Sequence, residues 1–156
     1  MIEIDIPGFG PVQLAHLVSD FTGTLSVDGR LLPGVKDALN QLARLMTIHI
    51  LTADTFGRAK EELAEVQCQI HILTGSNHDV QKEDYLKKLD PGKVVALGNG
   101  NNDRRMLKLA KVGIAVSEGE GCAVEAIMAA DIHVRSAMDG LTLLLNPLRC
   151  KATLRF

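Results

Sequence analysis

The run LVSDFTGTL at residues 17–25 decides the fold class, because an apolar segment ends there in a carboxylate and a glycine turn follows at once. In an open α/β sheet, ligands bind outside the carboxyl ends of the strands, which is where Asp20 would lie. A carboxylate in that place can attack an electrophile and hold the product as a covalent ester. Gly23 lets the next loop curl so that backbone N–H groups point at an anion. The alternative is an Asp that only caps a turn.

Short apolar runs alternate with helix-like segments on both sides of this stretch, which predicts a doubly wound parallel sheet with helices on both faces. A β-hairpin over residues 1–19 leads into the first core strand, and Asp28-Gly29 predicts a β-hairpin flap at 25–32. We expect further strands at residues 47–51, 70–73, 94–97, 112–116 and 132–134. We expect helices at residues 33–45, 56–66, 80–89, 104–110, 122–129 and 137–145, the last stopped by Asn146-Pro147.

Composition narrows the possible functions of the chain. Its 156 residues suit one domain over 1–156, and the net charge of -2 without a basic block argues against a nucleic-acid partner. No apolar run approaches the length that crosses a membrane, and the N-terminus lacks the features of a signal peptide, so we expect a cytoplasmic protein. The three cysteines are widely spaced and odd in number, which predicts neither a disulfide framework nor a zinc site.

Two further positions carry side chains that suit phosphate chemistry. Thr52 ends the strand at 47–51, where its hydroxyl would face the same crevice as Asp20. The alternative there is a helix N-cap in the stretch that follows. Lys82 lies early in the helix at 80–89, and an ammonium aimed into the crevice would neutralise the transferring oxygens. Its alternative is a solvated lysine.

The loop GNGNND at residues 98–103 follows a buried strand and combines two glycines with three asparagines. Such a loop suits unusual backbone angles and oxygen ligands. Asp103 with Asn99 would complete a hard oxygen site, which suits Mg²⁺ because this ion is bound by a few carboxylates, carbonyls and waters. The alternative is a helix start capped by Asn101 or Asn102.

In their order and spacing, the Asp20 loop, Thr52, Lys82 and the 98–103 loop resemble the motifs of the haloacid dehalogenase superfamily of phosphoryl-transfer enzymes. DFTGTL at 20–25 is similar to the DKTGTL of P-type ATPases, and GNGNND at 98–103 to their GDGxND. GIAV at 113–116 and ADI at 130–132 are similar to their trailing motifs. The chain looks most like a small group of soluble P-type ATPase-like proteins. The resemblance implies a Rossmann-like three-layer α/β/α core with a flap after the first motif and no cap domain.

The resemblance also implies a magnesium-dependent phosphohydrolase that forms an aspartyl phosphate on Asp20 and acts on a small phosphorylated substrate. It assigns catalysis to Asp20, Thr22, Thr52 and Lys82. It assigns substrate binding to Gly23, Thr52, Ala53, Lys82 and Asn102. It assigns the Mg²⁺ site to Asp20, the carbonyl of Thr22, Asn99 and Asp103, with Asp103 holding the waters of the metal and Lys82.

Two positions depart from the pattern of the phosphatases in this superfamily. Thr22 stands where those enzymes carry an Asp that protonates the leaving group and activates water, so we expect slow dephosphorylation. Asn99 stands where the superfamily has a metal-binding Asp, so we expect weakened metal affinity. These departures leave open a second hypothesis, a weakly active or non-catalytic protein of this fold that binds phosphate or a partner protein.

The intervals between the motifs leave no room for a cap domain. We therefore expect a site open to solvent. The resemblance to capless relatives implies either a homo-oligomer, a dimer or a tetramer, whose neighbouring subunit closes the site, or a macromolecular substrate that acts as its own lid. The membrane and nucleotide domains of an ion pump do not fit into 156 residues, so we expect no ion pumping.

Overall fold

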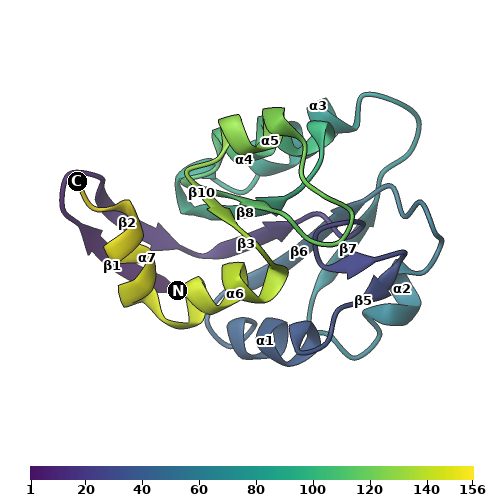
Figure 1. The fold of residues 1–156 in the computed structure, drawn as a ribbon, viewed down its shortest axis with the longest axis horizontal. Helices are drawn as coiled ribbons and strands as arrows, with labels where there is room; N and C mark the ends of the chain where they lie inside the picture. Colours follow the sequence, from purple (N-terminus) through teal and green to yellow (C-terminus); the bar gives the residue numbers. More distant parts are fainter.

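The computed structural model describes residues 1–156, with a central sheet between two layers of helices (Figure 1). The strands are β1 (Ile2–Ile6), β2 (Gly10–Leu14), β3 (His16–Ser19), β4 (Ser26–Val27), β5 (Arg30–Leu31), β6 (Thr47–Thr52), β7 (Gln69–Ile72), β8 (Val94–Gly98), β9 (Val112–Val116) and β10 (Ile132–Val134). The α-helices are α1 (Val35–Leu42), α2 (Ala59–Glu62), α3 (His78–Lys87), α4 (Arg104–Leu109), α5 (Val124–Ala129), α6 (Ala137–Leu145) and α7 (Pro147–Leu154). Short 3₁₀ turns lie at Pro91–Lys93 and Asn101–Asp103. None of the helices combines the length and the apolar character that crossing a bilayer requires.

The six strands of the central sheet follow the order β10-β9-β8-β3-β6-β7, and all neighbouring pairs are parallel. The chain therefore builds one side of the sheet from β3 through β6 to β7, and the other side from β8 through β9 to β10. The strand order reverses between β3 and β8. Ligands of open α/β sheets bind at such a switch point, outside the carboxyl ends of the strands. The predicted doubly wound fold is confirmed.

Side chains of the central strands alternate between two apolar layers, because successive residues of a strand point to opposite faces. Leu17 and Ile48 lie in the layer that includes the buried residues of α1 and α6. Val18 and Leu51 lie in the opposite layer, with buried residues of α3, α4 and α5. Both faces of the sheet are thus covered, and the carboxyl ends of its strands are held on a packed platform.

Both predicted hairpins are present, each as a separate two-stranded sheet. In the flap formed by β4 and β5, Asp28 and Gly29 have φ angles of 52° and 74°, as a two-residue hairpin turn requires. In the N-terminal hairpin the returning strand is divided at Ala15. β2 pairs with β1, whereas β3 joins the central sheet beside β6 and β8.

The helix predicted at 56–66 is much shorter in the structure, where α2 covers only Ala59–Glu62. Asp54 and Gly57 have φ angles of 51° and 66°, which interrupt any helix upstream. The Asp54 carboxylate then accepts hydrogen bonds from the N–H groups of Arg58 and Ala59, both at 2.9 Å, and so starts the helix there. The helix predicted from residue 33 likewise begins later, at Val35, because Gly34 before it is left-handed.

The prediction that the last helix stops at Asn146-Pro147 was right for α6 but missed α7. Asn146 has φ −126° and ψ 76°, which ends α6. Pro147 then opens α7 at a position where its missing N–H costs nothing. The helix buries Cys150 and lies against β1, so the N-terminal hairpin and the C-terminal helix pack together at one end of the molecule (Figure 1).

Stability is expected to depend on pH through His49, which lies on β6 and is only 2% exposed. Burial, and then the neighbouring His16 and His71, lower the pKa of His49 from 6.5 to about 4. Between these two pH values the unfolded chain binds a proton that the folded protein does not, so the free energy of unfolding falls as the pH decreases through this interval. We expect a loss of roughly 1–3 kcal/mol in urea unfolding.

The variant His49→Gln, which cannot titrate, is the reference for this measurement because other groups also titrate in the same interval. The stability of wild type relative to the variant should decrease as the pH is lowered. A difference that stays constant from neutral pH to about pH 4.5 would contradict the assignment to His49.

Candidate active site

Three strand ends meet at the switch point of the sheet. Asp20 follows β3, Thr52 is the last residue of β6, and Asn99 follows β8. Because β8, β3 and β6 are neighbours in the sheet, these side chains converge on one pocket of about 220 Å³. Its lining residues are Asp20, Thr22, Thr52, Ala53, Thr55, Asn99, Gly100 and Asn102. Only Ala53 among them is apolar, so the pocket is built to bind a polar group.

Lys82 is fully buried behind this pocket and is not a solvated lysine. Its ammonium donates to Asp20 Oδ1 at 2.8 Å and to Asp103 Oδ1 at 2.6 Å. Lys82 belongs to the second turn of α3, and Asp20 lies 62 residues before it in the chain. Because breaking a buried ion pair leaves an uncompensated charge, this lysine joins α3 firmly to both acidic loops.

The charges of this cluster change the acidity of its members. Burial, and then the charge of Asp103, raise the pKa of Asp20 to about 6, although Lys82 opposes the change. Burial would lower the pKa of Lys82, but Asp103 and Asp20 outweigh it and raise the pKa above the ordinary value for lysine. Lys82 is therefore charged at neutral pH, and Asp20 becomes the carboxylate required of a nucleophile only above mildly acidic pH.

Asp103 anchors the 98–103 loop and does not line the pocket. Its Oδ2 accepts hydrogen bonds from the N–H groups of Asn99 and Gly100 at 3.0 and 2.9 Å, while Oδ1 accepts from Lys82. The side chain is fully buried. The structure thus shows the contact between Asp103 and Lys82 that the resemblance implies, and it adds contacts that position the loop.

Thr24 connects two of the converging side chains. Its buried hydroxyl lies 3.2 Å from Asp20 Oδ2 and 3.1 Å from Asn99 Oδ1. The Asn99 amide also donates to the carbonyl of Gly121 at 3.1 Å. Gly23 has φ 78°, and a Cβ atom there would lie 2.5 Å from Asn99 Nδ2. Only glycine lets the Asp20 loop come this close to Asn99.

The oxygen atoms present fit a hard cation such as Mg²⁺. Asp20 Oδ2 and Asn99 Oδ1 approach the same Thr24 hydroxyl, so these two potential ligands lie close together. Thr22 lines the same pocket, and its Oγ1 is a buried polar atom without a hydrogen-bond partner. Carboxylate, amide and carbonyl oxygens are the ligand types that Mg²⁺ accepts. With Asp103 turned away, Asp20 is the only carboxylate in this set.

Sequence reasoning missed Thr55 and Gly100 as pocket residues and did not give Thr24 its connecting role. Thr55 and Gly100 lie three and two residues after the ends of β6 and β8, in loops that were already singled out, so their position was available as a signal. The role of Thr24 depends on an approach to Asn99 across 75 residues of chain, which no local pattern reports. Of the predicted substrate-binding residues, Thr52, Ala53 and Asn102 line the pocket together with Asp20, whereas Gly23 and Lys82 do not.

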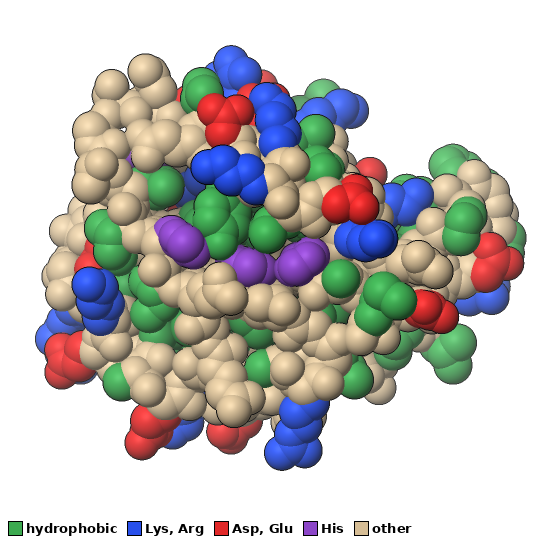
Figure 2. Space-filling view, turned by 180° about the vertical axis from the view of Figure 1, so that it is seen from behind, with side chains coloured by type: hydrophobic (Ala, Val, Ile, Leu, Met, Phe, Trp, Pro, Cys, Tyr) green, Lys and Arg blue, Asp and Glu red, His purple; other side chains and the backbone are tan.

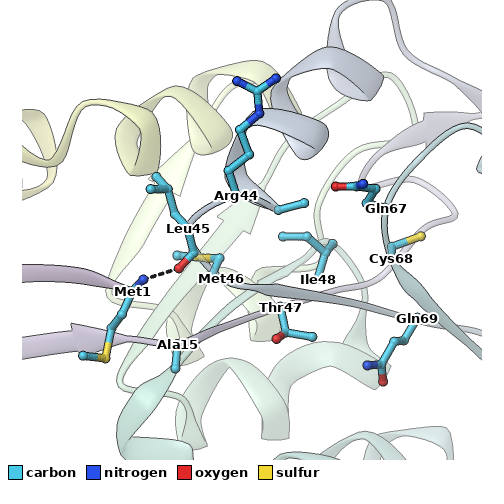
Figure 3. Close-up of a pocket in the computed structure, with 11 residues that line it drawn as sticks. Met1, Ala15, Arg44, Leu45, Met46, Thr47, Ile48, Gln67, Cys68 and Gln69 are labelled. Atoms are coloured by element: carbon cyan, nitrogen blue, oxygen red, sulfur yellow. Dashed lines mark hydrogen bonds between the residues drawn. The ribbon is translucent and has the colours of Figure 1, made fainter.

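A larger cavity of about 580 Å³ lies at the opposite end of the strands (Figure 3). Thr47 and Gln69, which begin β6 and β7, line it together with Met1 and Leu45, and the Met1 amine donates to the carbonyl of Leu45. Its walls contain no carboxylate and no histidine. Size therefore does not identify the site of chemistry here, whereas the convergence of acidic, basic and hydroxyl groups on the small pocket does.

Comparison with known proteins shows which family the sequence is similar to. The sequence profile of the haloacid dehalogenase-like hydrolases matches residues 76–139. A probable copper-exporting P-type ATPase of Archaeoglobus fulgidus is 33% identical over 105 residues, which are 66% of this chain and 13% of the ATPase. Residues 76–139 thus match the haloacid dehalogenase-like hydrolases, and the ATPase relative points to the same relationship. The relationship predicted from the sequence motifs is confirmed.

Two further matches show how far the similarity to known proteins extends along the chain. Uncharacterized protein MJ0073 of Methanocaldococcus jannaschii is 49% identical over 73 residues, which are 46% of this chain and 78% of that protein. The crystal structure of 3-deoxy-D-manno-octulosonate 8-phosphate phosphatase from Moraxella catarrhalis superposes with a TM-score of 0.66 over 85% of this chain and 86% of that chain. Its sequence identity is 18%, so this likeness shows a common fold.

Proposed function

We propose that this hydrolase is a magnesium-dependent phosphohydrolase that acts through an aspartyl phosphate on Asp20. The observation that carries the proposal is the placement of Asp20, which lies at the switch point, lines the polar pocket and is paired with the buried ammonium of Lys82 at 2.8 Å. The surrounding hydroxyl and amide groups of Thr52 and Asn102 suit the oxygens of a phosphoryl group.

In the first step a carboxylate oxygen of Asp20 forms a bond to the phosphorus of the substrate, and the bond from phosphorus to the ester oxygen breaks. The ammonium of Lys82 lies 2.8 Å from the attacking Asp20 and offsets the negative charge of the transferring phosphoryl oxygens. Thr52 and Asn102 hold the transferred group. The leaving oxygen takes its proton from water, because Thr22 has no acidic proton to give it.

In the second step water attacks the phosphorus of the aspartyl phosphate, orthophosphate leaves, and the Asp20 carboxylate is restored. A general base at position 22 would remove a proton from this water, but a threonine does not. We therefore propose that release of phosphate limits turnover.

Asp20, the carbonyl of Thr22 and Asn99 would hold Mg²⁺. When bound, the ion supplies positive charge next to the transferring oxygens. The phosphatase from Moraxella catarrhalis, with which this chain shares its fold, was solved in complex with a magnesium ion, a phosphate ion and a KDO molecule. That complex supports a divalent metal and a small phosphorylated substrate for this protein as well.

The variant Asn99→Asp is expected to lower the magnesium concentration for half-maximal activity about tenfold, because a charged carboxylate replaces a neutral amide oxygen. The variant also loses the hydrogen bond to the Gly121 carbonyl, which we expect to cost about 1 kcal/mol of stability. Magnesium titrations of the hydrolysis rate and urea unfolding measure the two effects.

Asn101→Asp is the matched control for this prediction, since it adds the same charge to the same loop at an exposed residue outside the pocket. It should change the magnesium dependence by less than about twofold. Unchanged or weaker magnesium binding in Asn99→Asp would remove Asn99 from the metal ligands.

The second candidate function is a protein that binds phosphate or a partner but turns over little or no substrate. Thr22 and the neutral Asn99 favour it, because both replace residues that support catalysis in related enzymes. The retained pairing of Asp20, Lys82 and Asp103 favours hydrolysis.

Hydrolysis of an aryl phosphate, with Mg²⁺ and with a chelator, separates the two functions. The phosphohydrolase should release the phenol in a magnesium-dependent manner. Binding of orthophosphate without any magnesium-dependent release would instead support the second function. A panel of phosphorylated metabolites would then define the substrate.

A further inference from the structure

A chain of hydrogen bonds links three histidines and the one tyrosine of this protein. His16 Nδ1 lies 3.1 Å from His49 Nε2, and His49 Nδ1 lies 2.9 Å from the hydroxyl of Tyr85. The same hydroxyl lies 2.7 Å from His71 Nε2. The histidines belong to β3, β6 and β7, which are adjacent strands, and Tyr85 belongs to α3. Figure 2 shows histidines in a row across this face of the molecule.

His49, in the middle of this hydrogen-bond chain, is buried and has both ring nitrogens hydrogen-bonded. His49 is 2% exposed, and both of its ring nitrogens have partners. A neutral imidazole has one donor and one acceptor. His49 therefore donates in one direction and accepts from the other, so all the bonds of the chain run the same way. Loss of the Tyr85 hydroxyl would leave a buried nitrogen without a partner, which is costly.

The four residues lie next to the elements that carry the catalytic groups. His16 is four residues before Asp20 on the strand that ends at it, and His49 is three residues before Thr52 on β6. On α3, Lys82 and Tyr85 are three residues apart, a spacing that places both on one side of a helix. Through Tyr85, these hydrogen bonds connect the side of α3 that carries Lys82 to β6 and β7.

We propose that this chain of hydrogen bonds holds α3 in register with the sheet, so that Tyr85 and His49 are positioning residues for Lys82. The proposal rests on the proposed function of Asp20. Lys82 makes contacts of 2.8 and 2.6 Å with two carboxylates, and such a group tolerates little displacement. A shift of about 1 Å in a catalytic group can cost about a hundredfold in rate.

Burial and the neighbouring side chains keep His49, the centre of the hydrogen-bond chain, neutral near neutral pH. Burial, and then His16 and His71, lower the pKa of His49 to about 4. Burial and Lys93 lower the pKa of His16, against Asp90, which raises it. Tyr85 is half-buried, and burial raises the pKa of its phenol. His71 is the exposed end of this series of hydrogen bonds.

Kinetics provide the first test. Tyr85→Phe removes a single oxygen atom and should lower kcat about tenfold while KM changes by less than about twofold. His71→Ala should lower kcat in the same direction, and His71→Gln should restore most of the loss, because its amide can reach the position of Nε2. His133→Ala is the matched control, since this exposed histidine on β10 bonds only to Ser117.

Spectroscopy provides a second test that does not depend on turnover. The ammonium of Lys82 is buried and hydrogen-bonded, so its ¹H–¹⁵N signal reports its contacts with Asp20 and Asp103. Tyr85→Phe should shift this signal, and His133→Ala should not. Because the protein has one tyrosine and no tryptophan, its intrinsic emission comes from Tyr85 and should change in His71→Ala but not in His71→Gln.

The two tests separate this inference from the proposed function. A wild-type protein without magnesium-dependent hydrolysis would reject the function, and the Lys82 signal would then decide the positioning role by itself. A Lys82 signal that does not move in Tyr85→Phe would overturn the inference, and in an active enzyme so would a kcat that stays within about twofold of wild type.

Discussion

Asp20→Asn should reduce hydrolysis of an aryl phosphate by at least about 10³-fold, because an amide cannot form the aspartyl phosphate. The same variant should be more stable than the wild type. Burial and Asp103 raise the pKa of Asp20 to about 6, so at pH 7 its ionised form is held at a cost that a neutral amide avoids. We expect a gain of roughly 1–2 kcal/mol in urea unfolding near neutral pH.

The stability of this variant relative to the wild type has a definite pH dependence. As the pH falls below about 6, the wild-type carboxyl takes up a proton and becomes neutral like the amide, so the difference should shrink. The hydrolysis rate of the wild-type free enzyme should fall over the same range, because the nucleophile is lost.

Asp139→Asn is the matched control, because Asp139 is exposed on α6 and its side chain forms no hydrogen bond. It should leave both activity and stability near wild type. Activity that survives in Asp20→Asn would rule out the aspartyl phosphate, whereas lost activity with lowered stability would indicate damage to the fold.

Thr22→Asp should speed the release of phosphate by about 10²-fold or more, the range that a positioned general acid and base contributes. Thr22 lines the pocket and its hydroxyl has no partner in the protein, so a carboxyl group at this position would reach the water and the leaving oxygen without breaking an existing hydrogen bond. In rapid-quench experiments the wild type should accumulate phosphoenzyme in a burst, and the variant should show little of it.

Thr55→Asp is the control for this prediction, because it places the same charge in the same pocket at another position. It should keep the burst. A wild-type enzyme with fast steady hydrolysis and no detectable phosphoenzyme would contradict the idea that Thr22 slows the second step.

Much of the fold could be predicted because local patterns report it. The alternation of apolar runs and helix-like segments identified all six strands of the central sheet, and Asp28-Gly29 identified the flap. The failures were at helix ends. The Asp54 carboxylate accepts a hydrogen bond from the Arg58 N–H, so α2 begins after that residue. Asn146 ends α6, and Pro147 begins α7. Such ends depend on single backbone angles and caps, which the hydrophobic period does not encode.

The candidate site divides in the same way. Asp20, Thr52 and Asn99 could be selected because each lies at a strand end, and in a parallel sheet all strands end at one edge. Lys82 was selected from its position early in a helix after a turn. The sequence could not show that Lys82 is buried between Asp20 and Asp103, because a lysine early in a helix is equally compatible with solvent. The contact of Asp103 with Lys82 came only from the resemblance to the superfamily, and the structure contains it at 2.6 Å.

For Asp20, then, local sequence alone indicated its place at the end of a strand and the glycine turn beside it. Tertiary structure decided what kind of carboxylate it is. Its raised pKa comes from burial and from Asp103, which lies 83 residues further along the chain, and its partner Lys82 lies 62 residues further. Charge interactions depend on distance in space and on exclusion of water, and both exist only after the chain has folded. The same reason hid the contacts of His16, His49, His71 and Tyr85, which lie far apart in sequence and meet only across three strands and a helix.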